Sequence, residues 1–195
     1  MGRIIVAALV SLMMSGCAIV TAVSGTAVEG LVYMFQGEEE SFPVSMRTML
    51  VATQRGLQKT DLNVSVLEPT KDGYLMGFGN ENLDGKIGLK KQTNKLTTVS
   101  IKVKDGGMRE ESVERALIST VRKESEKVKR SARFNFARYR NIREKKNVNS
   151  KQVGWYLPGK FLDVKAIQKS PWLRIKMPSG KTAYLKGDLA AFANK

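Results

Sequence analysis

The fold of this chain is decided between Val64 and Val103, where the sequence reads VSVLEPTKDGYLMGFGNENLDGKIGLKKQTNKLTTVSIKV. Apolar residues alternate, or nearly alternate, with polar residues in four short segments, at 64–66, 74–78, 87–89 and 96–103. Residues typical of turns separate them, at 71–73, 84–85 and 93–94. Alternation with a period of two places one side of a strand in a core, so the stretch predicts a four-stranded meander.

A helix is predicted just before the meander. Ser45 is a residue type that favours a helix N-cap, and Asp61 and Asn63 are suited to ending the helix. The apolar residues between them follow the helical period: Met46, Met49, Leu50, Thr53 and Leu57. Residues 41–44 before this helix are predicted as a short edge strand, and the helix is expected to cover one face of the sheet.

A second, longer helix is predicted after the breaker Gly106-Gly107. From Val113 to Ile142 the apolar positions advance by about 3.6 residues per step, and no Pro or Gly interrupts residues 110–146. The pattern predicts one helix from Glu110 to about Arg143, roughly 50 Å long at about 1.5 Å per residue. Its second half would act as a stiff connection to the C-terminal part of the chain.

From Asn147 onward the sequence indicates short strands. Apolar segments around Val148, Val153, residues 161–164, 172–175 and 183–185 are separated by Pro- and Gly-containing turns. Their order resembles the bacterial SH3-like domain. The resemblance implies a small β-barrel that binds cell-wall peptide or glycan, or a protein partner.

The N-terminus predicts export from the cytoplasm. Arg3, the apolar run 4–14 and the small residues before Cys17 form a secretory signal peptide. Residues 14–17 resemble the bacterial lipobox, which implies cleavage before Cys17 and acylation of its thiol, as with palmitate. The alternative is an uncleaved anchor that continues through residues 18–35 with a free Cys. Because Ala18 and not Asp follows the Cys, the resemblance implies an outer-membrane lipoprotein that faces the periplasm.

From Cys17 to about residue 130, the chain also resembles a family of small bacterial lipoproteins known only as a domain of unknown function. The resemblance is carried by the order of its features: Cys17, a Gly/Ala-rich tract to Tyr33, the segment 44–62, the run 98–103 and the final amphipathic helix. It implies a fold and a location but no activity.

The predicted fold class is α+β: a small antiparallel sheet with two helices, a long connecting helix, and then a small SH3-like β-barrel. The predicted organisation is a signal peptide at 1–16, an apolar tether at 17–40, an α+β domain of unknown function at 41–130, a basic helical linker at 131–146 and the SH3-like barrel at 147–195.

Charge and composition limit the function. The chain carries 33 basic and 18 acidic residues, has no His and has a single Cys. A His-dependent triad, a His-ligated metal and an internal disulfide are thereby excluded. Residues 131–195 hold 15 basic and 3 acidic side chains, a net charge of +12, which favours an anionic partner.

The prediction is a non-catalytic envelope lipoprotein, without cofactor or metal, held on the membrane through Cys17. Its SH3-like domain would bind peptidoglycan or an envelope protein, and no nucleic acid is expected in the periplasm. One alternative is an accessory subunit of a larger envelope or secretion assembly. The other is an enzyme that uses carboxylates such as Glu81 and Asp84, which are otherwise simply solvated.

Two groups of residues are candidates for binding. The predicted ligand-binding residues are Trp155, Tyr156, Trp172, Arg174 and Tyr184. The predicted anionic-surface residues are Arg133, Arg138, Arg140 and Arg143. In the alternative interpretation, Trp172 fills a small core and the arginines of the connecting helix are solvated while nearby aromatic rings pack against either domain.

Overall fold

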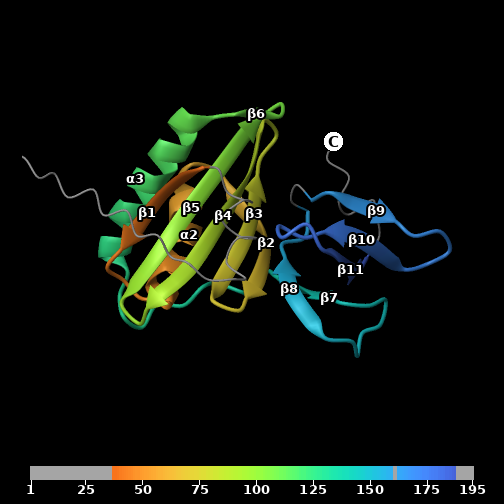
Figure 1. The fold of residues 1–195 in the computed structure, drawn as a ribbon. Helices are drawn as coiled ribbons and strands as arrows, with labels where there is room; N and C mark the ends of the chain where they lie inside the picture. Colours follow the sequence, from red (N-terminus) through yellow and green to blue (C-terminus); the bar gives the residue numbers. More distant parts are fainter. Residues whose placement is uncertain (1–36, 160–161, 188–195) are drawn as a thin grey trace, which may run out of the picture.

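The structure is a computed structural model that describes residues 37–159 and 162–187. Cys17, the predicted signal peptide and most of the predicted tether lie outside the described residues. Within these ranges the chain forms one antiparallel sheet of eleven strands, with two helices (Figure 1).

The strands follow one another across the sheet in the order β1-β5-β4-β3-β2-β8-β7-β11-β10-β9, and β6 pairs with β5. The helices are α2 (Met46–Lys59) and α3 (Glu111–Lys127). The strands are β1 (Glu38–Phe42), β2 (Asn63–Thr70), β3 (Gly73–Gly79), β4 (Leu83–Thr93), β5 (Leu96–Asp105), β6 (Met108–Arg109), β7 (Arg140–Arg143), β8 (Gln152–Tyr156), β9 (Val164–Ala166), β10 (Trp172–Lys176) and β11 (Thr182–Lys186).

Helix α2 confirms the prediction from its N-cap and apolar period. The Ser45 hydroxyl oxygen accepts a hydrogen bond from the Thr48 N–H at 3.3 Å, which satisfies one of the free donors at the helix start. Just after the helix, Asp61 has a φ of 55°, a left-handed conformation that helix interiors do not contain. The helix therefore begins after the Ser45 N-cap and ends before Asp61, as the sequence predicts.

Strands β2 to β5 confirm the predicted meander, and the edge strand β1 lies slightly earlier than residues 41–44. The predicted turn at 84–85 is wrong, because Asp84 and Gly85 lie within β4. The turn forms at residues 80–82, where the Asn80 carboxamide oxygen accepts hydrogen bonds from the backbone N–H groups of Asn82 and Leu83 at 3.1 and 2.9 Å.

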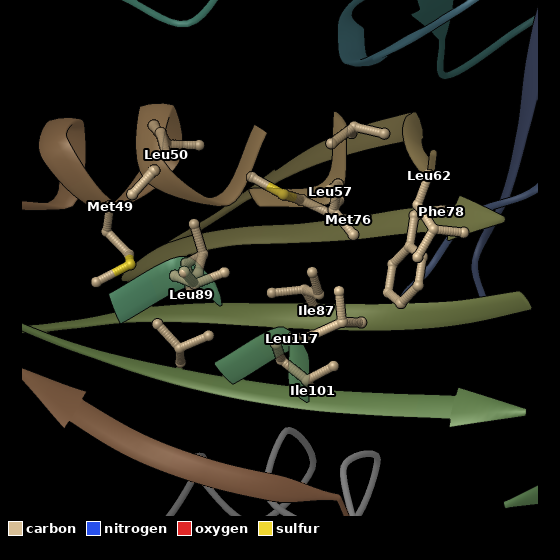
Figure 2. Packing of buried hydrophobic residues seen from close by; sticks show 14 of the residues in the cluster. Met49, Leu50, Leu57, Leu62, Met76, Phe78, Ile87, Leu89, Ile101 and Leu117 are labelled. Atoms are coloured by element: carbon tan, nitrogen blue, oxygen red, sulfur yellow. The ribbon is translucent and has the colours of Figure 1, made fainter. Parts of the chain in front are cut away.

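The main core lies between the two helices and one face of β1 to β5. Met49, Met76, Ile87 and Leu117 are at most 1% exposed, and Figure 2 shows side chains from α2 and the strands packed against one another. Full burial of one such apolar side chain contributes about 1.5–3 kcal/mol. The helices are therefore held on the sheet chiefly by apolar burial.

A buried carboxylate also fixes α3 to the sheet. Glu114 is fully buried, and its oxygens accept hydrogen bonds from the backbone N–H groups of Val103 and Glu38 at 3.0 and 3.1 Å and from Arg109 Nη2 at 2.7 Å. Burial by itself would raise the pKa of Glu114. The hydrogen bonds from Arg109, Val103 and Glu38 outweigh burial and lower that pKa below its ordinary value of 4.5.

The prediction of a long connecting helix is wrong. Helix α3 ends at Lys127, and residues 128–139, here called the connecting segment, contain no regular helix or strand. The Gln54 side chain accepts a hydrogen bond from the Asn135 N–H and donates one to the Asn135 carbonyl. The Asn135 backbone therefore bonds to a side chain of α2 and not to its own chain in a helical pattern. In addition, Lys129 and Arg133 are like charges four residues apart, which disfavours continuation of the helix.

The prediction of a small sheet followed by a separate SH3-like barrel is also wrong. Strand β8 pairs with β2 through Val66↔Tyr156 and Leu67↔Trp155, so the C-terminal strands extend one open sheet. Val66 also belongs to the second core, with Ile142 and Leu185. The first C-terminal strand is β7, within the segment predicted as helix, while Val148 lies in the turn that follows it.

Candidate functional site

The sheet register builds a basic row on strands β9, β10, β11 and β7. Lys165 lies opposite Arg174, Arg174 opposite Tyr184, and Tyr184 opposite Arg143. Directly opposed residues of antiparallel strands place their side chains on the same face. With about 4.8 Å between strands, the four side chains form a row roughly 15 Å long.

The basic row faces away from the second core. Along β10, Leu173 and Ile175 are buried while Arg174 and Lys176 are exposed, as the period of two requires. A shallow pocket of about 200 Å³ lies on this face, lined in part by Asp163, Lys165, Arg174 and Lys176. Three cations and one carboxylate make this pocket suited to an anionic group.

The cations of the basic row have few competing contacts. Within the described parts of the chain, all ion pairs closer than 4.0 Å lie among residues 38–127. Arg143 Nη1 donates a hydrogen bond to the Ser150 carbonyl at 2.9 Å, which holds its guanidinium beside the row. Solvent-facing charge without acidic partners attracts anions over about 8 Å at physiological ionic strength.

Of the predicted ligand-binding residues, the structure brings together Arg174 and Tyr184. Tyr156 is 2% exposed in the second core, and Trp172 is 9% exposed. Trp155 is half-buried against the main core, and its ring centroid lies 5.0 Å from that of Phe136. Tyr156 and Trp155 therefore pack within the fold, whereas Trp172 belongs to neither of the two apolar cores.

The predicted anionic-surface residues do not share one helix face. Arg133 Nη1 donates hydrogen bonds to the carbonyls of Ser131 and Ala132 within the connecting segment. Arg138 is exposed in the same segment, and Arg140 begins β7 opposite Tyr156. Only Arg143 joins the basic row, so the structure separates these four cations.

The connecting segment is held by aromatic packing. The Phe134 ring centroid lies 4.7 Å from that of Phe136 and 5.4 Å from that of Tyr139. The Tyr139 hydroxyl donates a hydrogen bond to the Val64 carbonyl at 2.8 Å, and burial raises the pKa of Tyr139 to about 12. The interleaved aromatic residues in this segment therefore have a structural role.

Hydrogen bonds also join the turn between β10 and β11 to strands β2 and β4. The buried Glu68 carboxylate accepts hydrogen bonds from the Ser179 N–H at 2.9 Å and the Ser179 hydroxyl at 2.6 Å. Lys86 Nζ donates to the Pro178 carbonyl at 2.9 Å. Burial lowers the pKa of Lys86, as do the nearby charges of Lys176 and Lys104.

The predicted ligand-binding and anionic-surface residues do not include Glu68, Lys86 or Lys165. Alternation along a strand indicates which of its residues face outward. It does not show that Lys165 lies opposite Arg174, because that depends on the register between β9 and β10. The contact between Glu68 and Ser179 spans 111 positions, which no local pattern indicates.

The carboxylates considered for catalysis lie outside the basic row. Glu81 is exposed in the turn before β4, and Asp84 lies opposite Lys104 on β5. No group of three or more His, Cys, Asp or Glu suited to a metal ion is found among residues 37–159 and 162–187. In the same ranges, no helix is long and apolar enough to cross a membrane.

Comparison with known proteins identifies a family. A search of curated proteins found no match. The family model described as "Protein of unknown function (DUF3568)" matches residues 2–138. The match includes β1 to β6, both helices and nearly all of the connecting segment, and it ends just before β7. Because the model matches more than half of the chain, this protein belongs to the DUF3568 family.

Proposed function

We propose that this protein is a non-catalytic lipoprotein of the bacterial cell envelope, and that its C-terminal strands bind peptidoglycan. The observation that carries the proposal is the basic row of Lys165, Arg174, Tyr184 and Arg143. Peptidoglycan stem peptides carry carboxylates, which these cations attract, and the Tyr184 ring offers an apolar surface for stacking.

The membrane anchor in this proposal is an acyl group on Cys17. Each buried CH₂ group contributes about 0.8 kcal/mol, so two or more chains hold a protein on a membrane stably. The short apolar run 4–14 and the small residues Ser15 and Gly16 support cleavage before Cys17. Ala18 in the next position supports an outer-membrane location that faces the periplasm.

Mass spectrometry of the membrane-extracted protein tests the anchor. We expect an N-terminal Cys17 that carries acyl chains, and Cys17→Ala should leave an uncleaved precursor. An intact Met1, or a Cys17 with a free thiol, would contradict this part of the proposal.

Sedimentation with purified sacculi tests the basic row. The chain from Ala18 onward, which lacks both the apolar run 4–14 and the acyl group, should sediment with sacculi more than with anionic vesicles. The pair Lys165→Glu and Arg174→Glu should reduce sedimentation, whereas the pair Lys123→Glu and Lys129→Glu, with the same change in net charge, should not. Equal loss with both pairs would show that only net charge matters, and stronger retention by vesicles would replace peptidoglycan with acidic lipid.

Salt separates electrostatic attraction from stacking. Charge–charge attraction between exposed groups weakens as ionic strength rises, while stacking on Tyr184 persists. Tyr184→Ala should therefore remove the binding that survives at high salt. Complete loss of wild-type binding near 0.15 M salt, the physiological range, would refute specific recognition by this row.

A further inference from the structure

The turn between β10 and β11 lies on the face of β3 and β4 that points away from the two helices. On β3, Met76 and Phe78 belong to the main core, so Gly77 between them faces the other side. A Cβ at Gly77 would lie 3.7 Å from Cγ of Pro178, so the turn approaches the sheet closely there. Lys86 lies opposite Gly77 on β4, and its Nζ donates the hydrogen bond of 2.9 Å to the Pro178 carbonyl.

Four lysines gather at this contact. Lys86 lies opposite Lys102 on β5, which places both side chains on the same face of the sheet. Lys104 follows Lys102 by two residues on that face, and Lys176 ends β10 just before the turn. Burial lowers the pKa of Lys86, and the charges of Lys176 and Lys104 lower it further, as expected of ammonium groups that lie near it. Lys86, Lys102, Lys104 and Lys176 are here called the junction cluster.

The positive charge of the junction cluster has little compensation. Within the described residues, none of its four lysines has an ion pair closer than 4.0 Å. The carboxylates near Lys86 are Asp84, which lies opposite Lys104, and Glu68, which is buried and bonded to Ser179. Like charges directly opposite each other destabilise a sheet. An anion bound between the lysines would therefore stabilise this part of the protein.

The junction cluster continues the basic row. On β10, Arg174 and Lys176 alternate with the buried Ile175, so both cations point to the same side and lie about 7 Å apart along the strand. Both line the shallow pocket of about 200 Å³. Lys176 thus belongs to the pocket and to the junction cluster. Cationic side chains extend from Lys165 on β9 to Lys104 on β5.

The combined length of these two features exceeds that of one stem peptide. A peptide of about four residues, such as a peptidoglycan stem, spans at most about 14 Å when it is extended. The basic row alone is roughly 15 Å long. One stem bound along the row would therefore leave the junction cluster free for acidic groups elsewhere in the same ligand.

We propose that the junction cluster binds the acidic groups of a second stem peptide, so that this protein recognises consecutive units of a peptidoglycan strand. The inference rests on the proposed function and adds the kind of ligand: a polymer with repeated carboxylates, not a single unit. Lysine ammonium groups are mobile point charges, which suits carboxylates that approach in several orientations. A second contact made by the same molecule strengthens binding because it is intramolecular.

Isothermal titration calorimetry of the chain from Ala18 onward, with two purified fragments, tests this proposal. One fragment is a disaccharide with one stem peptide, and the other is a tetrasaccharide with two. The tetrasaccharide should bind at least about tenfold more tightly, whereas the presence of two equivalent stems would by itself give only about twofold.

Charge reversal locates the second contact. The pair Lys102→Glu and Lys104→Glu should remove the gain of the tetrasaccharide but leave the disaccharide affinity within about twofold, because neither residue lines the pocket beside Arg174. The matched pair Lys123→Glu and Lys129→Glu, with the same change in net charge, should keep the gain. Loss of the gain in both pairs would show that only net charge matters and would overturn the proposal.

A second variant covers the case in which charge reversal disturbs the fold. The pair Lys102→Gln and Lys104→Gln removes the two charges without reversing them, and it should also reduce the gain. The melting temperature of each variant shows whether it is folded. A wild-type gain of no more than about twofold, or an unchanged gain in the folded variants of Lys102 and Lys104, would overturn this inference and leave the proposed function standing. Failure of both fragments to bind the wild type would instead refute the proposed function, and this inference with it.

Discussion

Glu114 provides the sharpest test of how α3 is attached to the sheet. Replacing it with Gln keeps the shape of the side chain but removes its charge and one acceptor oxygen. The two oxygens of Glu114 now accept from two backbone donors, Val103 and Glu38, and from Arg109. The Gln amide would retain one acceptor and turn an NH₂ group toward a donor.

The cost follows from these contacts. One buried N–H left without an acceptor costs about 1–3 kcal/mol. The Arg109 side chain is 36% exposed, so water can solvate its charge and the lost ion pair adds at most about 1 kcal/mol. We therefore expect Glu114→Gln to lower the free energy of unfolding by about 1–4 kcal/mol, or the melting temperature by about 2–16 °C.

Glu111→Gln is the matched control, because Glu111 Oε1 lies 3.0 Å from Nη1 of the same Arg109 but the Glu111 side chain is 55% exposed. This variant should lose at most about 1 kcal/mol. Urea unfolding of the full chain, followed by circular dichroism, measures both variants. Similar losses in the two variants would refute the argument from the buried donors.

The same carboxylate predicts a pH dependence. Because folding lowers the pKa of Glu114, its stabilising contribution is present above its ordinary value of 4.5 and is lost as the pH falls through the folded value. Stability of the wild type should decrease more than that of Glu114→Gln between pH 5 and pH 3. Parallel curves for the two proteins would contradict the lowered pKa.

Three further predictions test the fold. Since β8 joins the sheet to β2, fluorescence of variants that retain only Trp155 or only Trp172 should report one common unfolding midpoint, and two separate midpoints would indicate independent domains. Absorbance titration of the phenols should include a step with a pKa of about 12 that is absent in Tyr139→Phe, and an unchanged titration in that variant would be inconsistent with burial of the Tyr139 phenol. Gly85→Ala should lower the free energy of unfolding by about 1–3 kcal/mol, because a Cβ at this position would lie 2.4 Å from a ring carbon of Phe78. Gly77→Ala should lower it less, because a Cβ there would have contacts of 3.6 Å and longer. Equal losses of stability in the two variants would argue against this packing.

Local patterns determined much of the N-terminal part of the fold. Helix α2 follows from Ser45 and the apolar period, and strands β2 to β5 follow from alternation. In these elements, the pattern of apolar and polar residues within the element itself indicates which face of the helix or strand is buried. The exposed position of Arg174 was predictable for the same reason, since it alternates with Leu173 and Ile175 along one strand.

Long-range contacts decided the rest. The helical period continued beyond Lys127, yet Gln54 binds the backbone of Asn135, 81 positions away, and the connecting segment leaves the helix. The sequence of β8 is compatible with a small closed barrel, but its open edge pairs with β2. The basic row depends on which strand lies next to which, and strand neighbours are determined by burial and backbone pairing across the whole sheet.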